Sequence, residues 1–184
     1  NWKTLSPRLQ TEGRAIILNH ARDIHVKFRP FDPEKHLSVA GMRLDKWDLP
    51  ANAMEVVNSG SQQTDPLELT RDWFGMLNHG EIMTPVGSSD SHDVSRFIVG
   101  QARTYIRSDD DDPAKINEQE AITNFLAGNV MVSFGLLAEI EINDAYGPGE
   151  LAPASNEVKV SIKVSGPAWI DADRIELYAN GRKI

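Results

Sequence analysis

The sequence contains no cysteine among its 184 residues. Disulfides and thiolate metal sites are therefore excluded, and so is a cysteine nucleophile. Any metal ion would have to be held by histidine, aspartate or glutamate. The lack of cysteine leaves the compartment open, since it is compatible with cytoplasm, periplasm and secretion.

The sequence also lacks a long apolar run and an excess of positive charge. The longest apolar candidate, residues 130–142, is interrupted by Ser133, Gly135, Glu139 and Glu141, so it falls short of the ~20 apolar residues that a membrane helix needs. The net charge is -8 and the basic residues are scattered, which argues against a nucleic-acid-binding surface. A phosphorylated small substrate stays compatible with this acidity, because bound divalent cations would dominate the local field.

Strand and helix signals alternate through most of the chain. Apolar runs at 15–18, 53–58 and 84–88 predict buried strands. Asp65-Pro66 and Asp112-Pro113 have the composition of helix starts. This alternation predicts an α/β fold with a largely parallel sheet or barrel.

The pattern changes after residue 140. Apolar and polar residues alternate over 158–164, which predicts a half-buried antiparallel strand, and Asn180-Gly181 is a hairpin-turn signal. We therefore expect an α/β part over residues 1–140 and an appended, truncated β-rich segment over 141–184. The edge of such a segment is compatible with a homo-oligomer.

The strongest chemical signal is the run from Gly87 to His92, Gly-Ser-Ser-Asp-Ser-His, at the end of a predicted strand. Asp90 and His92 are two positions apart, so in extended chain both side chains point to one face. The carboxyl ends of parallel strands are where α/β folds place their active sites. A polar strand exit, with Asp90 capping the next segment, is the alternative, and spacing alone does not decide between the two.

His20 is the second signal, because it follows another predicted strand directly. A lone histidine in this position is commonly a hydrogen-bonded structural residue. Two strand ends that carry a histidine and an Asp-x-His pair favour a metal site instead. The mixture of ligands suits Zn, Mn or Fe and does not choose among them.

These residues, taken in order, match a known pattern. Asn19-His20, Glu55-Val56-Val57-Asn58, residues 86–92 and residues 100–105 resemble the later motifs of the PHP (polymerase and histidinol phosphatase) superfamily, and within it the CehA/McbA-like metallohydrolases. The resemblance extends over roughly residues 5–180. It implies the C-terminal part of a distorted β/α barrel followed by a small antiparallel β segment. It also implies a site with two or three divalent metal ions that hydrolyses a small phosphoester or another ester.

The resemblance assigns roles to individual residues. His20, Asp90 and His92 would be metal ligands and the catalytic residues. Glu55 and Asn58 would lie around the metal site or face the substrate.

Arg103 would contact an anionic substrate oxygen. An outward-facing arginine in a salt bridge is the alternative.

Ala21 departs from the family, in which a proline follows the motif histidine. The family's first metal-binding motifs are expected before Asn1, so we expect these residues to be an inactive fragment with an incomplete metal site. The rival interpretation is a non-catalytic binding module on a degenerate fold of this kind.

Overall fold

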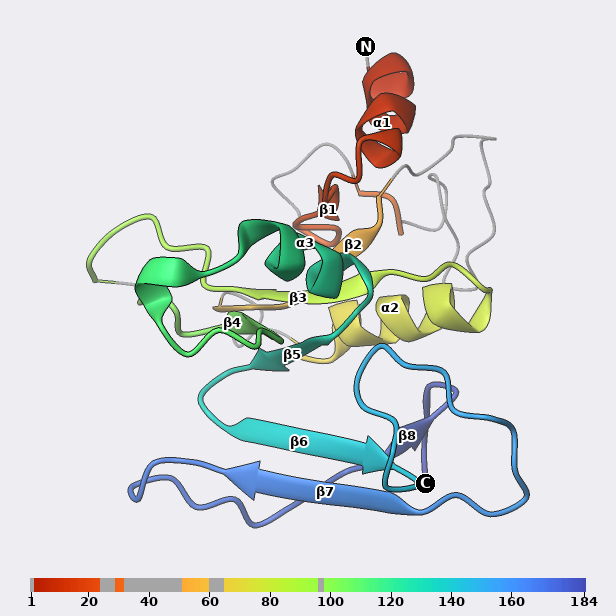
Figure 1. Ribbon diagram of the computed structural model, residues 1–184. Coiled ribbons are helices and arrows are strands. Elements are labelled where there is room, and N and C mark those ends of the chain that lie inside the picture. Colours follow the sequence, from red (N-terminus) through yellow and green to blue (C-terminus); the bar gives the residue numbers. More distant parts are fainter. Residues whose placement is uncertain (1, 24–28, 32–50, 60–64, 96–97) are drawn as a thin grey trace.

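The computed structural model describes residues 2–23, 29–31, 51–59, 65–95 and 98–184 (Figure 1). The helices are α1 (Trp2–Thr11), α2 (Glu68–Asn78) and α3 (Glu118–Leu126), with a 3-10 turn at Pro113–Lys115. The strands are β1 (Ile17–Leu18), β2 (Ala53–Asn58), β3 (Thr84–Ser88), β4 (Arg103–Ile106), β5 (Val130–Ser133), β6 (Leu137–Ile142), β7 (Val160–Ser165), β8 (Tyr178–Ala179) and β9 (Arg182–Lys183). None of the helices in these ranges is long and apolar enough to cross a membrane.

A parallel sheet with the strand order β1-β2-β3 forms the centre of the molecule. Ala53 pairs with Thr84 at one end of β2 and Asn58 with Ser88 at the other, with an irregularity between Glu55 and Val57. β2 is the middle strand, and five of its six residues are buried. A run of apolar residues is what a strand covered on both faces requires.

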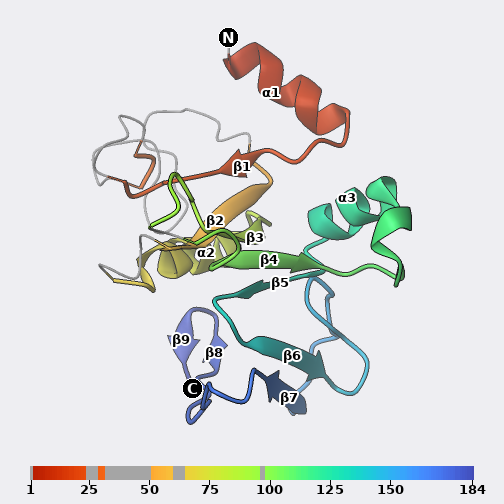
Figure 2. The same ribbon diagram turned by 90° about the vertical axis from the view of Figure 1, so that its left-hand side faces the viewer.

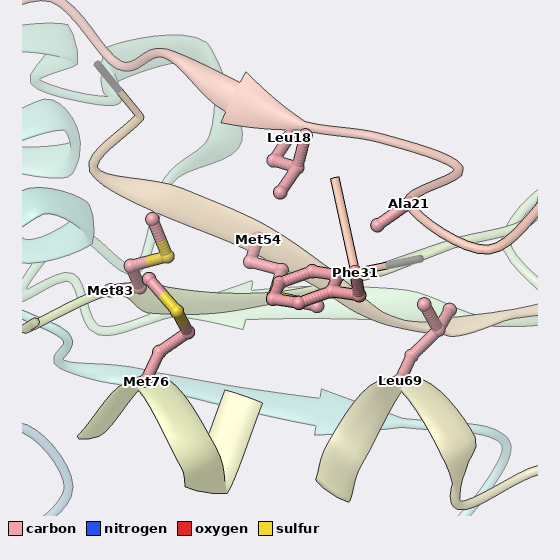
Figure 3. Packing of buried hydrophobic residues seen from close by; sticks show 7 residues of the cluster. All are labelled: Leu18, Ala21, Phe31, Met54, Leu69, Met76 and Met83. Carbon is pink, nitrogen blue, oxygen red and sulfur yellow. The ribbon is translucent and has the colours of Figure 1, made fainter. Parts of the chain in front are cut away.

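The two faces of this sheet are packed by different helices. Met54 belongs to a core cluster that also contains Leu18, Ala21, Phe31, Leu69, Met76 and Met83 (Figure 3). The neighbouring Ala53 belongs to a second cluster, with Val86, Phe125 and Val130. Because adjacent strand residues point to opposite faces, α2 covers one face and α3 the other. Each large apolar side chain buried in this way contributes about 1.5–3 kcal/mol relative to exposure.

The remaining strands form three separate antiparallel pairs, β4-β5, β6-β7 and β8-β9. β4 lies against β3, where the hydroxyl of Thr104 donates to the carbonyl oxygen of Gly87 and accepts from its N–H. Figures 1 and 2 show the β6-β7 pair on the opposite side of the molecule from α1.

The predicted β/α barrel is wrong. In the described ranges the sheets have two or three strands each, and they do not close into a barrel. An eight-stranded barrel needs continuous pairing around its whole circumference. Here parallel pairing stops at β3, and β5 returns antiparallel to β4 after the intervening α3. The molecule is a mixed α/β fold with small sheets.

Several predicted elements have the observed bounds, and others do not. The strands expected at 53–58 and 84–88 are β2 and β3. The run at 15–18 forms only the two-residue β1. Asp112-Pro113 begins the 3-10 turn, whereas α3 begins after Asn117, whose side chain accepts from the N–H of Glu120.

The C-terminal hairpin lies against α2. Its turn residues Asn180 and Gly181 both have positive φ, 50° and 75°, as the predicted turn requires. The side-chain amide of Asn78 donates to the carbonyl oxygen of Asn180 at 3.0 Å, and the rings of Phe74 and Tyr178 lie 5.8 Å apart. The C-terminal hairpin is thereby attached to α2.

Candidate functional site

The predicted ligands meet at the carboxyl edge of the parallel sheet. His20 comes two residues after the end of β1, and Asp90 comes two residues after the end of β3. β2 lies between these strands and carries Glu55 and Asn58. Parallel strands end at the same edge, so the two loops emerge side by side on either side of β2.

One oxygen of Asp90 adjoins both histidines. Asp90 Oδ1 lies 3.6 Å from His20 Nε2 and 3.1 Å from His92 Nε2. Asp90 and His20 are each about one-third exposed, at 30% and 31%, whereas His92 is 73% exposed. The structure therefore brings all three predicted ligands together at a place that solvent reaches.

Glu55 is the buried centre of this arrangement, since its side chain is only 1% exposed. Its Oε2 accepts from the backbone N–H of His20 at 2.9 Å and from the ring Nδ1 of His20 at 3.1 Å. Its Oε1 accepts from Asn58 Nδ2 at 3.0 Å and from the hydroxyl of Ser88. A carboxylate that only accepts is suited to this set of donors. Glu55 thereby connects the ends of all three parallel strands.

The backbones of His20 and Asp90 are left-handed, with φ of 54° and 50°. This conformation costs a residue other than glycine about 1–2 kcal/mol, less for aspartate than for histidine. The other described non-glycine residues with positive φ are Asn143, Asp144 and Asn180, all in turns. Strained residues concentrate at functional sites, where the surrounding structure holds them. Strain at both strand ends supports a site at this edge.

The hydrogen bonds of His20 leave one ring nitrogen available. Glu55 Oε2 faces Nδ1 at 3.1 Å, so in the neutral ring with the proton on Nδ1 the other nitrogen, Nε2, has its lone pair toward Asp90. A metal-binding histidine commonly donates its other ring N–H to a carboxylate in this manner. Nitrogen and oxygen ligands about 2.1 Å from a tetrahedral zinc lie about 3.4 Å apart, and the 3.6 Å between Nε2 and Oδ1 is close to that separation. In donor chemistry, then, the pair fits a divalent metal ion.

The ligand set is nevertheless incomplete. No group of three or more histidine, aspartate or glutamate side chains in the described ranges is placed to hold a metal ion. His92 Nε2 lies 3.1 Å from Asp90 Oδ1, which is within hydrogen-bond distance. The three residues are neighbours, and a coordination sphere would need His92 to turn and further ligands to join.

Hydrogen bonds of Ser89 hold the chain on either side of Asp90. The hydroxyl of Ser91 donates to that of Ser89 at 3.1 Å, and Ser89 Oγ also accepts from the N–H of Gly100 at 3.3 Å. Ser89 and Gly100 therefore lie close together beside β3. This geometry fixes Asp90 near the sheet while His92 extends into solvent.

Besides Glu55, two side chains were predicted to bind the substrate, Asn58 and Arg103, and their surroundings differ. Asn58 is buried and donates to Glu55, so it supports the buried side of the site. Arg103 is exposed on β4, and its Nη1 lies 3.4 Å from the hydroxyl of Tyr105. Among the described residues Arg103 bonds to Tyr105 and not to His20, Asp90 or His92, so the structure brings Asn58 to the site and does not bring Arg103 to it.

Sequence reasoning missed three residues of this edge, namely Ser88, Arg22 and Asp72. Asp72 lies on the same face of α2 as Leu69 and Met76 and is 2% exposed. An acidic residue within an apolar helical stripe is a signal that it has a buried partner. That partner is Arg22, for which the sequence has no comparable signal. The other two histidines of the N-terminal part, His25 and His36, belong to none of the matching motifs and lie outside the described residues.

Comparisons with models of protein families, with curated proteins and with solved structures found no match to this chain. The resemblance to the PHP superfamily therefore stays a prediction, and the function has to be argued from the site.

Proposed function

We propose that this chain is part of a metal-dependent hydrolase that cleaves phosphoester or related ester bonds with metal-activated water. The observation that carries the proposal is the position of Asp90 Oδ1, 3.6 Å from His20 Nε2 and 3.1 Å from His92 Nε2. Imidazole and carboxylate ligands at the carboxyl edge of a parallel sheet are the donor set of hydrolytic zinc, manganese and iron sites. The resemblance to PHP hydrolases is in line with this proposal.

The residues of the site have separate tasks in this mechanism. His20 offers Nε2 as a ligand when its ring is neutral and Nδ1 donates to Glu55. Asp90 supplies an anionic oxygen between the two histidines, and His92 reaches the site from the solvent side. Divalent metal ions, two or three in the complete site, would lower the pKa of a bound water and polarise the scissile group. Asn58 and Ser88 keep Glu55 in place by donating to its other oxygen.

Metal loading of defined variants tests the proposal. The chain, alone and together with any sequence that precedes it in its gene, is equilibrated with Zn²⁺ or Mn²⁺, desalted and measured by elemental mass spectrometry. We expect His20→Gln and Asp90→Asn to lower the bound metal. His79→Gln is the matched control, because His79 is an exposed histidine that caps the far end of α2. Turnover of bis(p-nitrophenyl) phosphate and of p-nitrophenyl acetate then distinguishes phosphoester from carboxyl-ester hydrolysis.

Two results would contradict the proposed function. If Asp90→Asn leaves both metal content and turnover at the level of the unaltered protein, the ligand assignment is wrong. Metal-free protein in every form, after reconstitution, reduces His20, Asp90 and His92 to structural polar residues.

A binding module without catalysis is the second candidate, and the β6-β7 pair favours it. This two-stranded sheet stands apart from the parallel sheet, and Leu137 and Ile140 on β6 are 43% and 38% exposed. Isolated two-stranded sheets are marginally stable and gain from added strands. A binding module predicts concentration-dependent association, measured by analytical ultracentrifugation, that Ile140→Lys abolishes without any effect of added metal.

A further inference from the structure

Arg22 follows the predicted ligand His20 by two residues and forms a buried ion pair with α2. Its Nε lies 2.7 Å from Asp72 Oδ2, and its Nη2 lies 2.7 Å from Asp72 Oδ1. Both contacts are short and parallel, which is the bidentate geometry that arginine makes with a carboxylate. Asp72 is 2% exposed and Arg22 is 20% exposed, so solvent screens this pair little.

The residues around this pair keep Arg22 in one position. Its guanidinium carbon lies 5.8 Å from the centre of the Phe31 ring, a cation–π distance. Glu68 Oε1, one turn earlier on α2, lies 3.8 Å from its Nη1. Phe31 itself is buried in the core cluster with Leu69 of α2 (Figure 3). Arg22 is therefore attached to α2 through both Asp72 and Glu68.

The chain between His20 and Arg22 has little freedom. Ala21 is fully buried in the same core cluster, and the N–H of Asp23 donates to the carbonyl oxygen of His20 at 3.1 Å. His20 is thus held on one side by Glu55 of β2 and on the other by a tight turn whose third residue is fixed to α2. A strained left-handed residue such as His20 needs surroundings of this kind.

We propose that Arg22 and Asp72 are positioning residues for His20, an inference that rests on the proposed function because it gives His20 the role of a ligand. The ion pair holds the turn at residues 20–23, the turn fixes the backbone of His20, and the backbone sets where Nε2 points. Neither Arg22 nor Asp72 touches the metal or the substrate in this scheme. Supporting residues of this kind typically change metal affinity by about 10–100-fold.

The experiment compares four proteins: the unaltered chain, Asp72→Asn, Arg22→Lys and Asp65→Asn. Asp65→Asn is the matched control, because it makes the same chemical change in an exposed ion pair, with Arg71, at the start of the same helix. Circular dichroism first establishes that each variant is folded. Arg22→Lys retains the charge but loses the bidentate contact. It therefore replaces Asp72→Asn as the test variant if Asp72→Asn does not fold.

Two measurements follow, and the first needs no metal. The ring nitrogen shifts of ¹⁵N-labelled histidine report which nitrogen of His20 carries the proton. We expect Nδ1 in the unaltered chain and in Asp65→Asn, and a mixture of both tautomers in Asp72→Asn and Arg22→Lys. The second measurement is Zn²⁺ affinity by calorimetry, for which we expect a loss of about tenfold in the last two variants only.

Folded Asp72→Asn and Arg22→Lys proteins with the unaltered tautomer and the unaltered zinc affinity would overturn the positioning role. The results differ if the proposed function is wrong and His20 is not a metal ligand. In that case His20 shows no response to zinc in any protein, while the metal-free tautomer comparison still decides whether the ion pair positions its ring.

Discussion

The same oxygen of Glu55 binds both the backbone and the side chain of His20. Oε2 lies 2.9 Å from the backbone nitrogen of His20 and 3.1 Å from its ring Nδ1. One buried carboxylate on β2 therefore holds both the strained backbone after β1 and the direction of the ring. Its second oxygen extends this control to β3 through Ser88.

Glu55→Gln is expected to destabilise the fold although it conserves size. A glutamine amide has a single accepting oxygen, so donors that met Oε1 or Oε2 would face an NH₂ group. Each buried donor left without an acceptor costs about 1–3 kcal/mol. Urea unfolding followed by circular dichroism measures the loss. The exposed Glu141→Gln is the control and should stay within about 0.5 kcal/mol of the unaltered chain, so equal effects of the two substitutions would contradict the role of Glu55.

Substitutions of Asp90 separate ligand chemistry from backbone strain. Asn, Gly and Ala all remove the carboxylate, so differences among these variants report the left-handed backbone, with its φ of 50°. Glycine and asparagine tolerate this region, whereas alanine costs about 1–2 kcal/mol. We expect the free energy of unfolding to be lowest for Asp90→Ala. Equal unfolding energies of Asp90→Gly and Asp90→Ala would show that the backbone is not strained in solution.

The central strands and the meeting of His20 with Asp90 could be predicted from the sequence because they depend on local patterns. The apolar run 53–58 is long enough to mark a buried strand, and a polar residue placed directly after a parallel strand has to lie at the sheet edge. His20 and Asp90 follow this rule and are 3.6 Å apart.

The barrel and the supporting residues could not be predicted because they depend on distant pairings. Alternation of strands and helices does not fix strand direction, and Tyr105 pairs with Met131 in an antiparallel register. Likewise Arg22 and Asp72 are separated by 50 residues. No sequence pattern indicates that an arginine in a loop forms a buried ion pair. The exposure of Arg103 depends in the same way on where β4 lies.

Gly87→Ala is expected to disturb the site through β3. A Cβ at position 87 would lie 2.7 Å from the carbonyl oxygen of Arg103 and 2.8 Å from Val132 Cγ1, so β4 and β5 would have to move. Overpacking of this kind costs about 1–3 kcal/mol. Gly147→Ala is the control, because its Cβ would meet only Glu150 Oε2, at 3.8 Å. Urea unfolding and the His20 ring shifts measure both effects, and unchanged values for Gly87→Ala would contradict the close approach of β4.

The attachment of the C-terminal hairpin is expected to weaken in acid. The hydrogen bond from Lys183, with that from Tyr178, holds the pKa of Glu176 below its ordinary value of 4.5. A carboxyl whose pKa is lowered in the folded state stabilises that state above its ordinary pKa, and this contribution is lost as the pH falls through the lowered value. NMR shifts of Tyr178 and Gly181, which lie against Phe74, should therefore move toward exposed values between pH 5 and pH 3. The upper limit lies just above the ordinary carboxyl pKa and the lower limit lies below it, because the pKa of Glu176 is lowered.

Glu176→Gln should remove this pH dependence and show the weaker attachment already at neutral pH. Glu157→Gln, an exposed substitution of the same kind, should keep the transition. Because the ion pairs of Glu176 are exposed, 1 M salt should reduce the difference between Glu176→Gln and the unaltered chain. A transition that persists in Glu176→Gln would assign the acid response to other carboxyl groups and leave Phe74 and Asn78 as the contacts that hold the hairpin on α2.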